Sequence, residues 1–361
     1  MSPFSPVFAS PTLPKTPVKP SLPQAPTTRW GSRLLMLALV GLLGACASSF
    51  DLQGHRGARG LAPENTLAAF DTALSVGVST LELDIAISAD KIAVISHEQA
   101  LYEPLTRDAQ GQWLPARGPL IKNLNLAQLQ AFDVGRMNPN AAYGKPFANQ
   151  QASDGERIPT LTALFERVKA LGADNVRFNI ETKIFPDRPD ETVGPDAFVD
   201  SILAAIAQAG MASRVSLQSF DWRTLQRVQK LAPDIPTVYL SVENQRFSNI
   251  VDGSWSAGLK KAAFESVPHM VKSAGGRVWS PNFNNLNQQD LKKAKDLGLQ
   301  VIPWTVNNPD DMDRLLQWGV DGIITDFPDR LRERMQSRGM ALPRAYAAQV
   351  RALPRAAFVH P

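Results

Sequence analysis

Residues 52–70 read LQGHRGARGLAPENTLAAF, which is a short apolar run, a turn rich in glycine and proline, and the start of an amphipathic helix. This order is typical of one strand followed by one helix. The turn needs small residues, but it does not need the pair His55–Arg56 that follows the apolar run directly. We therefore interpret the stretch as one β/α unit whose turn carries functional side chains.

The same alternation continues from residue 50 to about residue 330. Eight strands with helices between them predict an α/β fold, a (β/α)8 TIM barrel, which typically has about 250 residues. The expected strands are 50–54, 80–86, 175–181, 214–218, 236–240, 277–280, 299–304 and 322–325. The expected helices are 67–76, 161–171, 197–209, 223–231, 291–297 and 312–318, with a further helix from about residue 331.

One strand-like run, 92–96, breaks the alternation, because only residues 88–91 separate it from the second strand. A parallel crossover needs a dozen or more residues, so this run should form an antiparallel β-hairpin with the second strand. If Ser88 pairs with Lys91 across the turn, Glu82 faces His97. Residues 98–157 then form an inserted segment, a small subdomain or a lid over the barrel mouth.

The N-terminus predicts export. Arg29 and Arg33 precede the apolar or small residues 34–45, and this stretch is too short to cross a bilayer, which takes about 20 residues. A charged region, a short apolar region and small residues at its end describe a secretory signal peptide. It ends in LGAC, which resembles a bacterial lipobox with Cys46, the only cysteine of the chain, as the lipidated residue.

We therefore expect a lipoprotein that is anchored to a bacterial membrane and faces the periplasm. The alternative is a chance cysteine beside an ordinary cleavage site, which would give a soluble periplasmic protein. One cysteine excludes an internal disulfide.

Three regions follow from these patterns. Residues 1–45 combine the signal peptide with a Pro-rich extension, whose prolines recur every third residue from Pro11 to Pro26 and suit polyproline II. That extension is either discarded in the cytoplasm or the result of a start site placed too early. Residues 46–330 form the barrel, and residues 331–361 form a basic tail.

The charge distribution excludes a nucleic-acid partner for the barrel. The whole chain has a net charge of +4, but residues 1–50 carry +4 and residues 331–361 carry +5. Residues 51–330 therefore carry −5, which is the opposite of a basic nucleic-acid footprint.

Barrel enzymes carry their catalytic residues at the carboxyl ends of the strands. Glu82 and Asp84 lie two residues apart on the second strand and so share a face, and Glu181 and Lys183 repeat this spacing at the third strand. The other strand-end residues are His55 and Arg56 after the first strand, His97 after the hairpin arm, and Trp304 after the seventh strand.

These residue types suit one chemistry. Carboxylates this dense repel one another unless a cation joins them, and oxygen ligands suit Mg²⁺ or Ca²⁺ rather than zinc. Arg56 and Lys183 supply fixed positive charge for a phosphate. His55 and His97, at opposite edges of the mouth, suit a general base and a general acid. The combination predicts phosphodiester cleavage, and no dinucleotide fingerprint points to redox chemistry.

Each feature also has an ordinary structural explanation. Single histidines at strand ends are more often structural, Glu-x-Asp is commonly a solvated face, and Glu-Thr-Lys is commonly a surface ion pair. Their occurrence together at successive strand ends favours an active site. His269 and His360 lie outside this pattern, and we expect both to be structural.

The blocks HRG…PENT, LELDIAIS…ISHE, RIPTL, FNIETK, SLQSFD and PWTVN…GVDGIITDFP occur in this order. Over residues 51–330 the chain thereby resembles the glycerophosphodiester phosphodiesterases. The resemblance implies a (β/α)8 barrel that hydrolyses deacylated phospholipids, such as glycerophosphocholine, to glycerol 3-phosphate and an alcohol. It also implies a bound Ca²⁺ or Mg²⁺ ion.

By this resemblance Glu82, Asp84 and Glu181 would hold the metal, and His55 and His97 would be the acid–base pair. It favours attack by the glycerol 2-hydroxyl, which gives a cyclic phosphate that water then opens. His55 would be the first base and His97 the first acid.

The resemblance also implies that Arg56 and Lys183 grip the phosphate, that Trp304 lines the substrate cleft, and that Glu64 orients its neighbours. The glycines of the first turn, Gly54, Gly57 and Gly60, would let the backbone approach the phosphate.

Two residues depart from the family pattern. Glu98 follows His97 where the family usually has Asp, and Lys91 ends the hairpin turn where it usually has Gly. Two alternatives stay open, namely a phospholipase D-like enzyme acting on lysolipids or sphingolipids and a non-catalytic lipoprotein that binds phosphodiesters.

Overall fold

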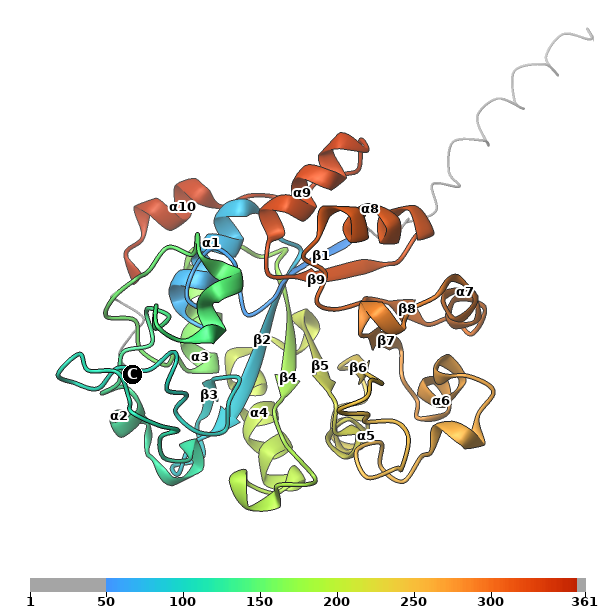
Figure 1. Ribbon diagram of the computed structural model, residues 1–361, viewed down its shortest axis with the longest axis horizontal. Coiled ribbons are helices and arrows are strands. Elements are labelled where there is room, and N and C mark those ends of the chain that lie inside the picture. The colour runs from blue at the N-terminus through green and yellow to red at the C-terminus, as the bar shows by residue number, and fades with distance from the viewer. Residues whose placement is uncertain (1–49, 356–361) are drawn as a thin grey trace, which may run out of the picture. The chain divides into compact units, whose positions relative to one another are not determined.

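The computed structural model describes residues 50–355, which form the predicted (β/α)8 barrel (Figure 1). Its parallel strands lie in the order β8-β7-β6-β5-β4-β2-β1-β9, and backbone hydrogen bonds from Asp321 to Val301 and from Ile324 to Pro303 join β9 to the β8 segment. The strands are β1 (Asp51–Gly54), β2 (Thr80–Ile87), β4 (Arg177–Thr182), β5 (Val215–Ser219), β6 (Thr237–Ser241), β7 (Val278–Pro281), β8 (Gln300–Val301) and β9 (Gly322–Thr325), with β3 (Ala93–Ile95) paired to β2 outside the barrel.

A helix follows each barrel strand, and most of these helices begin at a side chain that caps the first turn. The capping residues accept hydrogen bonds from backbone N–H groups of the first turn, and they are Thr66, Thr160, Asp221, Asn287 and Asn308. The barrel helices are α1 (Leu67–Val76), α3 (Leu161–Ala170), α4 (Pro195–Ala209), α5 (Trp222–Leu231), α6 (Val267–Ser273), α7 (Gln288–Asp296), α8 (Pro309–Trp318) and α9 (Pro328–Ser337). α10 (Ala347–Ala352) packs against α1.

α6 was not predicted from the sequence. This helix has seven residues and a proline in its first turn, so it is too short to show a helical period.

The predicted hairpin is present, but its predicted register is wrong by one residue. Ile85 lies opposite Ile95, so Glu82 does not face His97. The turn holds three residues rather than two, and its last residue, Lys91, has a left-handed φ of 64°. A three-residue hairpin loop needs such a residue, which explains why glycine is usual there.

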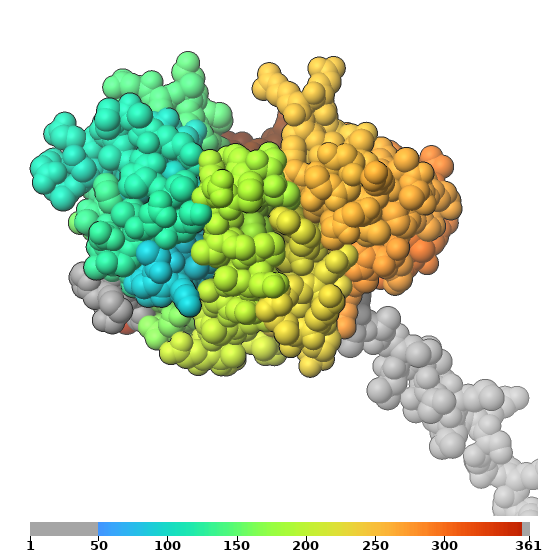
Figure 2. Space-filling view, turned by 90° about the horizontal axis from the view of Figure 1, so that it is seen from below, coloured from blue at the N-terminus to red at the C-terminus, as the bar shows by residue number. Residues whose placement is uncertain are grey.

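The inserted residues 98–157 form a bulge on one side of the barrel, shown in cyan and green in Figure 2. They contain the short helices η1 (Ile121–Asn123), α2 (Leu126–Leu129) and η2 (Ala142–Phe147). A small apolar cluster joins this segment to the hairpin, and its buried members are Ala86, Val94, Leu101, Ile121, Leu126, Leu129 and Ile158.

Side-chain alternation along β2 separates the core from the site. Leu81, Leu83 and Ile85 belong to the main apolar core, whereas Glu82 and Asp84 point the other way, into the barrel. This is the period-two pattern that the sequence shows, and it places the carboxylates inside a buried strand. No helix among residues 50–355 is long and apolar enough to cross a membrane.

Candidate active site

A cavity of about 200 Å³ opens at the carboxyl ends of the barrel strands. Asp84 and Glu64 both contact Arg56, which lies in the cavity wall. The other predicted residues that line the cavity are His55, Glu82, His97, Glu181, Lys183 and Trp304. The predicted lipidation residue, Cys46, lies outside the described residues.

The carboxylates Glu82, Asp84 and Glu181 form a buried group whose possible ligand oxygens lie within 4.8 Å of one another. Strand pairing produces this group, because Asp84 on β2 lies beside Glu181 on β4. Asp84 Oδ1 is buried and has no hydrogen-bond partner. An unpartnered oxygen among three buried carboxylates fits a hard cation such as Ca²⁺ or Mg²⁺.

The pKa shifts of these three carboxylates also favour a bound cation. Burial, together with the charges of Asp84 and Glu181, raises the pKa of Glu82 well above its usual range. Burial also raises the pKa of Glu181 to about 7, although Lys183 opposes this shift. Burial would raise the pKa of Asp84 too, but Arg56 and Lys183 outweigh it and lower that pKa. A cation would supply the charge needed to keep all three carboxylates ionised.

His55 is held in one orientation by a residue from the far end of the barrel sequence. Its Nδ1 lies 2.6 Å from Oδ1 of Asp326, and its Nε2 lies 4.0 Å from Oε2 of Glu82. Burial lowers the pKa of His55, although Asp326 opposes the shift. The neutral ring donates its Nδ1 proton to Asp326, which leaves the Nε2 lone pair free to act as a base.

His97 enters the cavity from the end of the hairpin. Its Nδ1 lies 2.7 Å from Oε1 of Glu98, so Glu98 orients the ring although the family usually has Asp at this position. Burial, followed by the charges of Arg56 and Lys183, lowers the pKa of His97 well below its usual range.

The predicted phosphate-binding cations alternate with the carboxylates. Arg56 Nη1 donates to Glu64 Oε1 over 2.6 Å, and the Arg56 Nε lies 3.3 Å from Asp84 Oδ2. Lys183 Nζ donates to Glu181 Oε1 over 2.9 Å. Arg56 has a φ of 50°, a strained conformation for a residue with a side chain, as is common at functional sites.

Packing against the protein accounts for Gly54 and Gly60 of the first turn, whereas the expected approach of the backbone to a phosphate stays a prediction. A Cβ atom on Gly54 would lie 2.1 Å from the carbonyl oxygen of Gly57. A Cβ atom on Gly60 would lie 2.3 Å from the ring of Phe327. The protein itself occupies the space that the missing side chains leave.

A row of aromatic side chains leads from the cavity toward solvent. The Trp304 and Phe220 rings lie edge to face with centroids 5.2 Å apart, and Phe220 lies 6.4 Å from Phe247. Trp255 continues the row 5.0 Å from Phe247, and Phe185 lies 5.7 Å from Trp255. Only Trp304 was predicted, because the other four lie in loops that carry no strand or helix period.

Two residues that hold the predicted side chains in place, Asp326 and Gln218, were not predicted from the sequence. Asp326 lies in the TDFP block, which was used only to identify the family. Asp326 accepts two hydrogen bonds from Arg59, at 2.8 and 2.9 Å, and one from Asn307 at 2.7 Å. Gln218 donates to Glu82 Oε1 over 2.7 Å. Their position at strand ends was a usable signal, since Gln218 is the next-to-last residue of β5 and Asp326 directly follows β9.

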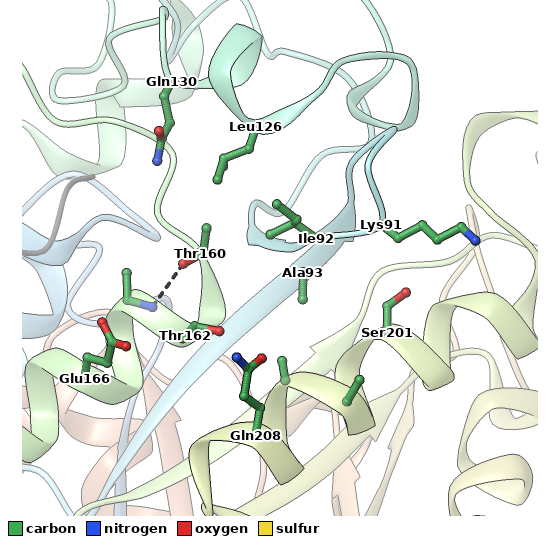
Figure 3. Close-up of a pocket in the computed structure, with 13 residues that line it drawn as sticks. Lys91, Ile92, Ala93, Leu126, Gln130, Thr160, Thr162, Glu166, Ser201 and Gln208 are labelled. Carbon is green, nitrogen blue, oxygen red and sulfur yellow. Dashed lines mark hydrogen bonds between the residues drawn. The ribbon is translucent and has the colours of Figure 1, made fainter. Parts of the chain in front are cut away.

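A second hollow, of about 390 Å³, lies between the hairpin, α3 and α4 (Figure 3). Glu166 is the one carboxylate in its lining and Lys91 the one lysine, and no histidine lines it. This hollow therefore lacks the group of carboxylates and the histidines that mark the candidate site at the strand ends.

Comparison with known proteins agrees with the site. A model of the glycerophosphoryl diester phosphodiesterase family matches residues 55–330. The chain is 31% identical over 279 residues to a glycerophosphodiester phosphodiesterase of Bacillus subtilis (strain 168), which covers 76% of this chain and 83% of that protein. A protein of Silicibacter pomeroyi DSS-3 with a known crystal structure is assigned by inference to the same enzyme class. It is 34% identical to this chain, the match covers 82% of this chain and 96% of that one, and the TM-score is 0.74.

A phosphodiesterase of Oleispira antarctica, solved with the product sn-glycerol 3-phosphate, shares the fold. It is 22% identical, with a TM-score of 0.57 over 79% of this chain and 96% of that one.

Proposed function

The chain belongs to the glycerophosphoryl diester phosphodiesterase family and is a phosphoric diester hydrolase, and we propose that it uses a divalent cation and two histidines to release glycerol 3-phosphate and an alcohol. The observation that carries the proposal is the buried group of Glu82, Asp84 and Glu181 beside two oriented histidines. The product bound to the Oleispira antarctica protein is the phosphate product of this reaction.

The metal would be Ca²⁺ or Mg²⁺, held by Glu82, Asp84 and Glu181. When bound, such an ion withdraws charge from a phosphoryl oxygen and so stabilises the transition state. Arg56 and Lys183 already lie between these carboxylates and would bind the remaining phosphate oxygens.

His55 is the better candidate for the first base. Its Nδ1 is bound to Asp326 and its Nε2 carries a lone pair, so it can accept a proton from an attacking hydroxyl. His97 would protonate the leaving alcohol, because the negative charge of a bound phosphodiester favours its imidazolium form. Replacing either histidine by Ala should lower kcat by about 10²–10⁴-fold.

Two routes fit this pair. The glycerol 2-hydroxyl can attack phosphorus, which forms a new O–P bond, expels the alcohol with the proton from His97, and leaves a cyclic phosphate that water opens. Alternatively, water attacks directly. We favour the cyclic route because a hydroxyl on the substrate is already in place. Near-normal turnover of a diester whose glycerol lacks the 2-hydroxyl would exclude it.

A panel of glycerophosphodiesters tests the metal requirement. EDTA should abolish turnover, and added Ca²⁺ or Mg²⁺ should restore it. The Glu181→Gln variant should need a higher metal concentration, whereas Glu166→Gln, outside the site, should behave as wild type. Full turnover in a chelated, metal-free sample would contradict the proposal.

The aromatic row supports a second candidate activity, on lysolipids. Phe247, in the middle of the row, is partly exposed, so an apolar arm of a substrate could lie along it. A relative that is 24% identical, human GDPD1, bears the name lysophospholipase D. Parallel assays with glycerophosphocholine and lysophosphatidylcholine decide between the two, and Phe247→Ser should reduce only the turnover of the lysolipid.

We also propose that Cys46 is lipidated and anchors the protein to a bacterial membrane on its periplasmic side. The proposal rests on the sequence LGAC after a short apolar region. Stable anchoring requires more than one acyl chain.

A further inference from the structure

The inserted segment reaches back to the first loop of the barrel through Tyr143 of η2. The Tyr143 hydroxyl donates a hydrogen bond to Glu64 Oε2 over 2.6 Å. It accepts one from Arg56 Nη1 over 3.2 Å and one from Arg59 Nη1 over 3.3 Å. A phenolic hydroxyl has one proton and two lone pairs, so all its bonding capacity is used.

These partners belong to two separate parts of the site. Arg56 contacts Asp84 and is a proposed phosphate ligand. Arg59 binds Asp326, which orients His55. The two guanidinium groups repel each other, and the hydroxyl places its lone pairs between them.

The insertion holds Tyr143 and Arg59 firmly. The Tyr143 ring packs edge to face on Tyr102 with centroids 5.2 Å apart. Phe147 lies under the Arg59 guanidinium at 4.8 Å, and Gln150 donates to the Arg59 carbonyl oxygen over 2.6 Å. Tyr143 itself does not line the cavity, so its effect passes through the arginines.

We propose that Tyr143 is a positioning residue, which fixes Arg56 and Arg59 and makes residues 98–157 a structural part of the phosphate site. The proposal rests on the proposed function, since it takes the phosphate to bind at Arg56. It assigns to the insertion a role in binding the phosphate.

The test compares Tyr143→Phe with Tyr102→Phe. Both variants keep the ring pair, but among residues 50–355 the Tyr102 hydroxyl makes no hydrogen bond, so only Tyr143→Phe removes hydrogen bonds, namely those to Glu64, Arg56 and Arg59. Loss of a hydrogen bond to charged groups should raise KM for a glycerophosphodiester about tenfold, with kcat changed much less. Tyr102→Phe should leave both unchanged.

A binding measurement separates this inference from the proposed function. The dissociation constant of inorganic phosphate, measured by calorimetry with Ca²⁺ present, should rise about tenfold in Tyr143→Phe even if no substrate is turned over. If wild type shows no turnover but this difference is present, the proposed function fails and the inference stands. If Tyr143→Phe binds phosphate as Tyr102→Phe does, the inference fails.

A double-mutant cycle distinguishes positioning from a general loss of stability. In an Arg56→Lys background the Arg56 Nη1 group that donates to the Tyr143 hydroxyl is absent. Tyr143→Phe should therefore have little further effect on phosphate binding in this background. An equal tenfold effect in both backgrounds would overturn the proposal. Thermal unfolding of each variant shows whether it is folded at the assay temperature.

Discussion

Asp326 has the most demanding set of partners in the site. Its carboxylate accepts from His55, Arg59 and Asn307, and it is almost completely buried. Burial would raise the pKa of Asp326, but His55 and Arg59 outweigh it and lower that pKa, so the carboxylate stays ionised. An ionised Asp326 can only accept, which fixes the proton of His55 on Nδ1.

We predict that Asp326→Asn lowers kcat by about 10³–10⁴-fold with little change in KM. The amide nitrogen cannot accept, so the favoured His55 tautomer and its orientation are lost. Steady-state kinetics measure the effect, with Asp313→Asn, at the contact of α8 with α9, as the matched control. A kcat within threefold of wild type would show that Asp326 does not orient the base.

At the scale of elements, α1 and α3 are joined by a buried ion pair. Arg167 donates twice to Asp71, over 3.0 Å each, and both side chains are almost fully buried. Removing one partner of such a pair leaves an uncompensated buried charge.

Asp71→Ala should therefore lower the free energy of unfolding by about 3–5 kcal/mol. The partly exposed pair of Asp313 with Arg334 offers a comparison, and Asp313→Ala should cost less than about 1 kcal/mol. Urea unfolding of the two variants measures both values. Similar losses would mean that burial does not decide the strength of these pairs.

The insertion contains an ion network that should respond to pH. Arg107 Nη2 lies 2.6 Å from both Asp133 and Asp154, and Arg136 Nη2 also lies 2.6 Å from Asp154. Hydrogen bonding to Arg136, with burial opposing it and Arg107 adding to it, lowers the pKa of Asp154. Asp154 is half-exposed, so the network contributes less than about 1 kcal/mol.

A carboxyl group whose pKa is lowered by folding stabilises the fold at pH values above its pKa in the unfolded chain, which is about 3.9. This contribution is lost as the pH falls through the pKa of the group in the folded state. The melting temperature of wild type should therefore exceed that of Asp154→Asn at pH 7, and the difference should shrink below about pH 4. Thermal unfolding of both proteins between about pH 3 and about pH 7 measures this difference in melting temperature. A difference that grows toward acid pH would contradict the assignment.

At the scale of the whole molecule, the start of the first strand and the cavity lie at opposite ends of the barrel, because the barrel strands are parallel. Asp51 begins β1 at the amino-end face, whereas the cavity lies at the carboxyl ends. Cys46 precedes Asp51 by five residues, and such a length spans at most about 18 Å. An anchor at Cys46 would thus keep Asp51 within about 18 Å of the lipidated residue.

Cys46→Ser should release the protein from membranes without changing its kcat on soluble glycerophosphodiesters. Cell fractionation and assays of both fractions measure this. If the variant stays in the membrane fraction and wild type carries no lipid, the anchor is wrong. A released variant with much higher activity would instead show that the anchor restricts the cavity.

Local patterns in the sequence were sufficient for the architecture and for the carboxylates and histidines that gather at the cavity. Alternation at period two predicted that Glu82 and Asp84 share the inner face of a strand, and the order of strands and helices predicted the barrel. These features repeat over a few residues, so they can be read without knowing which distant segments meet. The hairpin register was wrong because one left-handed residue, Lys91, adds a position to the turn.

The sequence by itself thus determined the barrel, its strand-end carboxylates and its histidines, because each depends on neighbours along the chain. Only the tertiary structure decided what orients them. Asp326 meets His55 across 271 positions, and Tyr143 meets Arg56 across 87. The physical reason is closure of the barrel, which places β9 beside β1, and the packing of the insertion, which brings η2 over the first loop. No local period encodes such contacts, since both depend on how the whole chain buries its apolar surface.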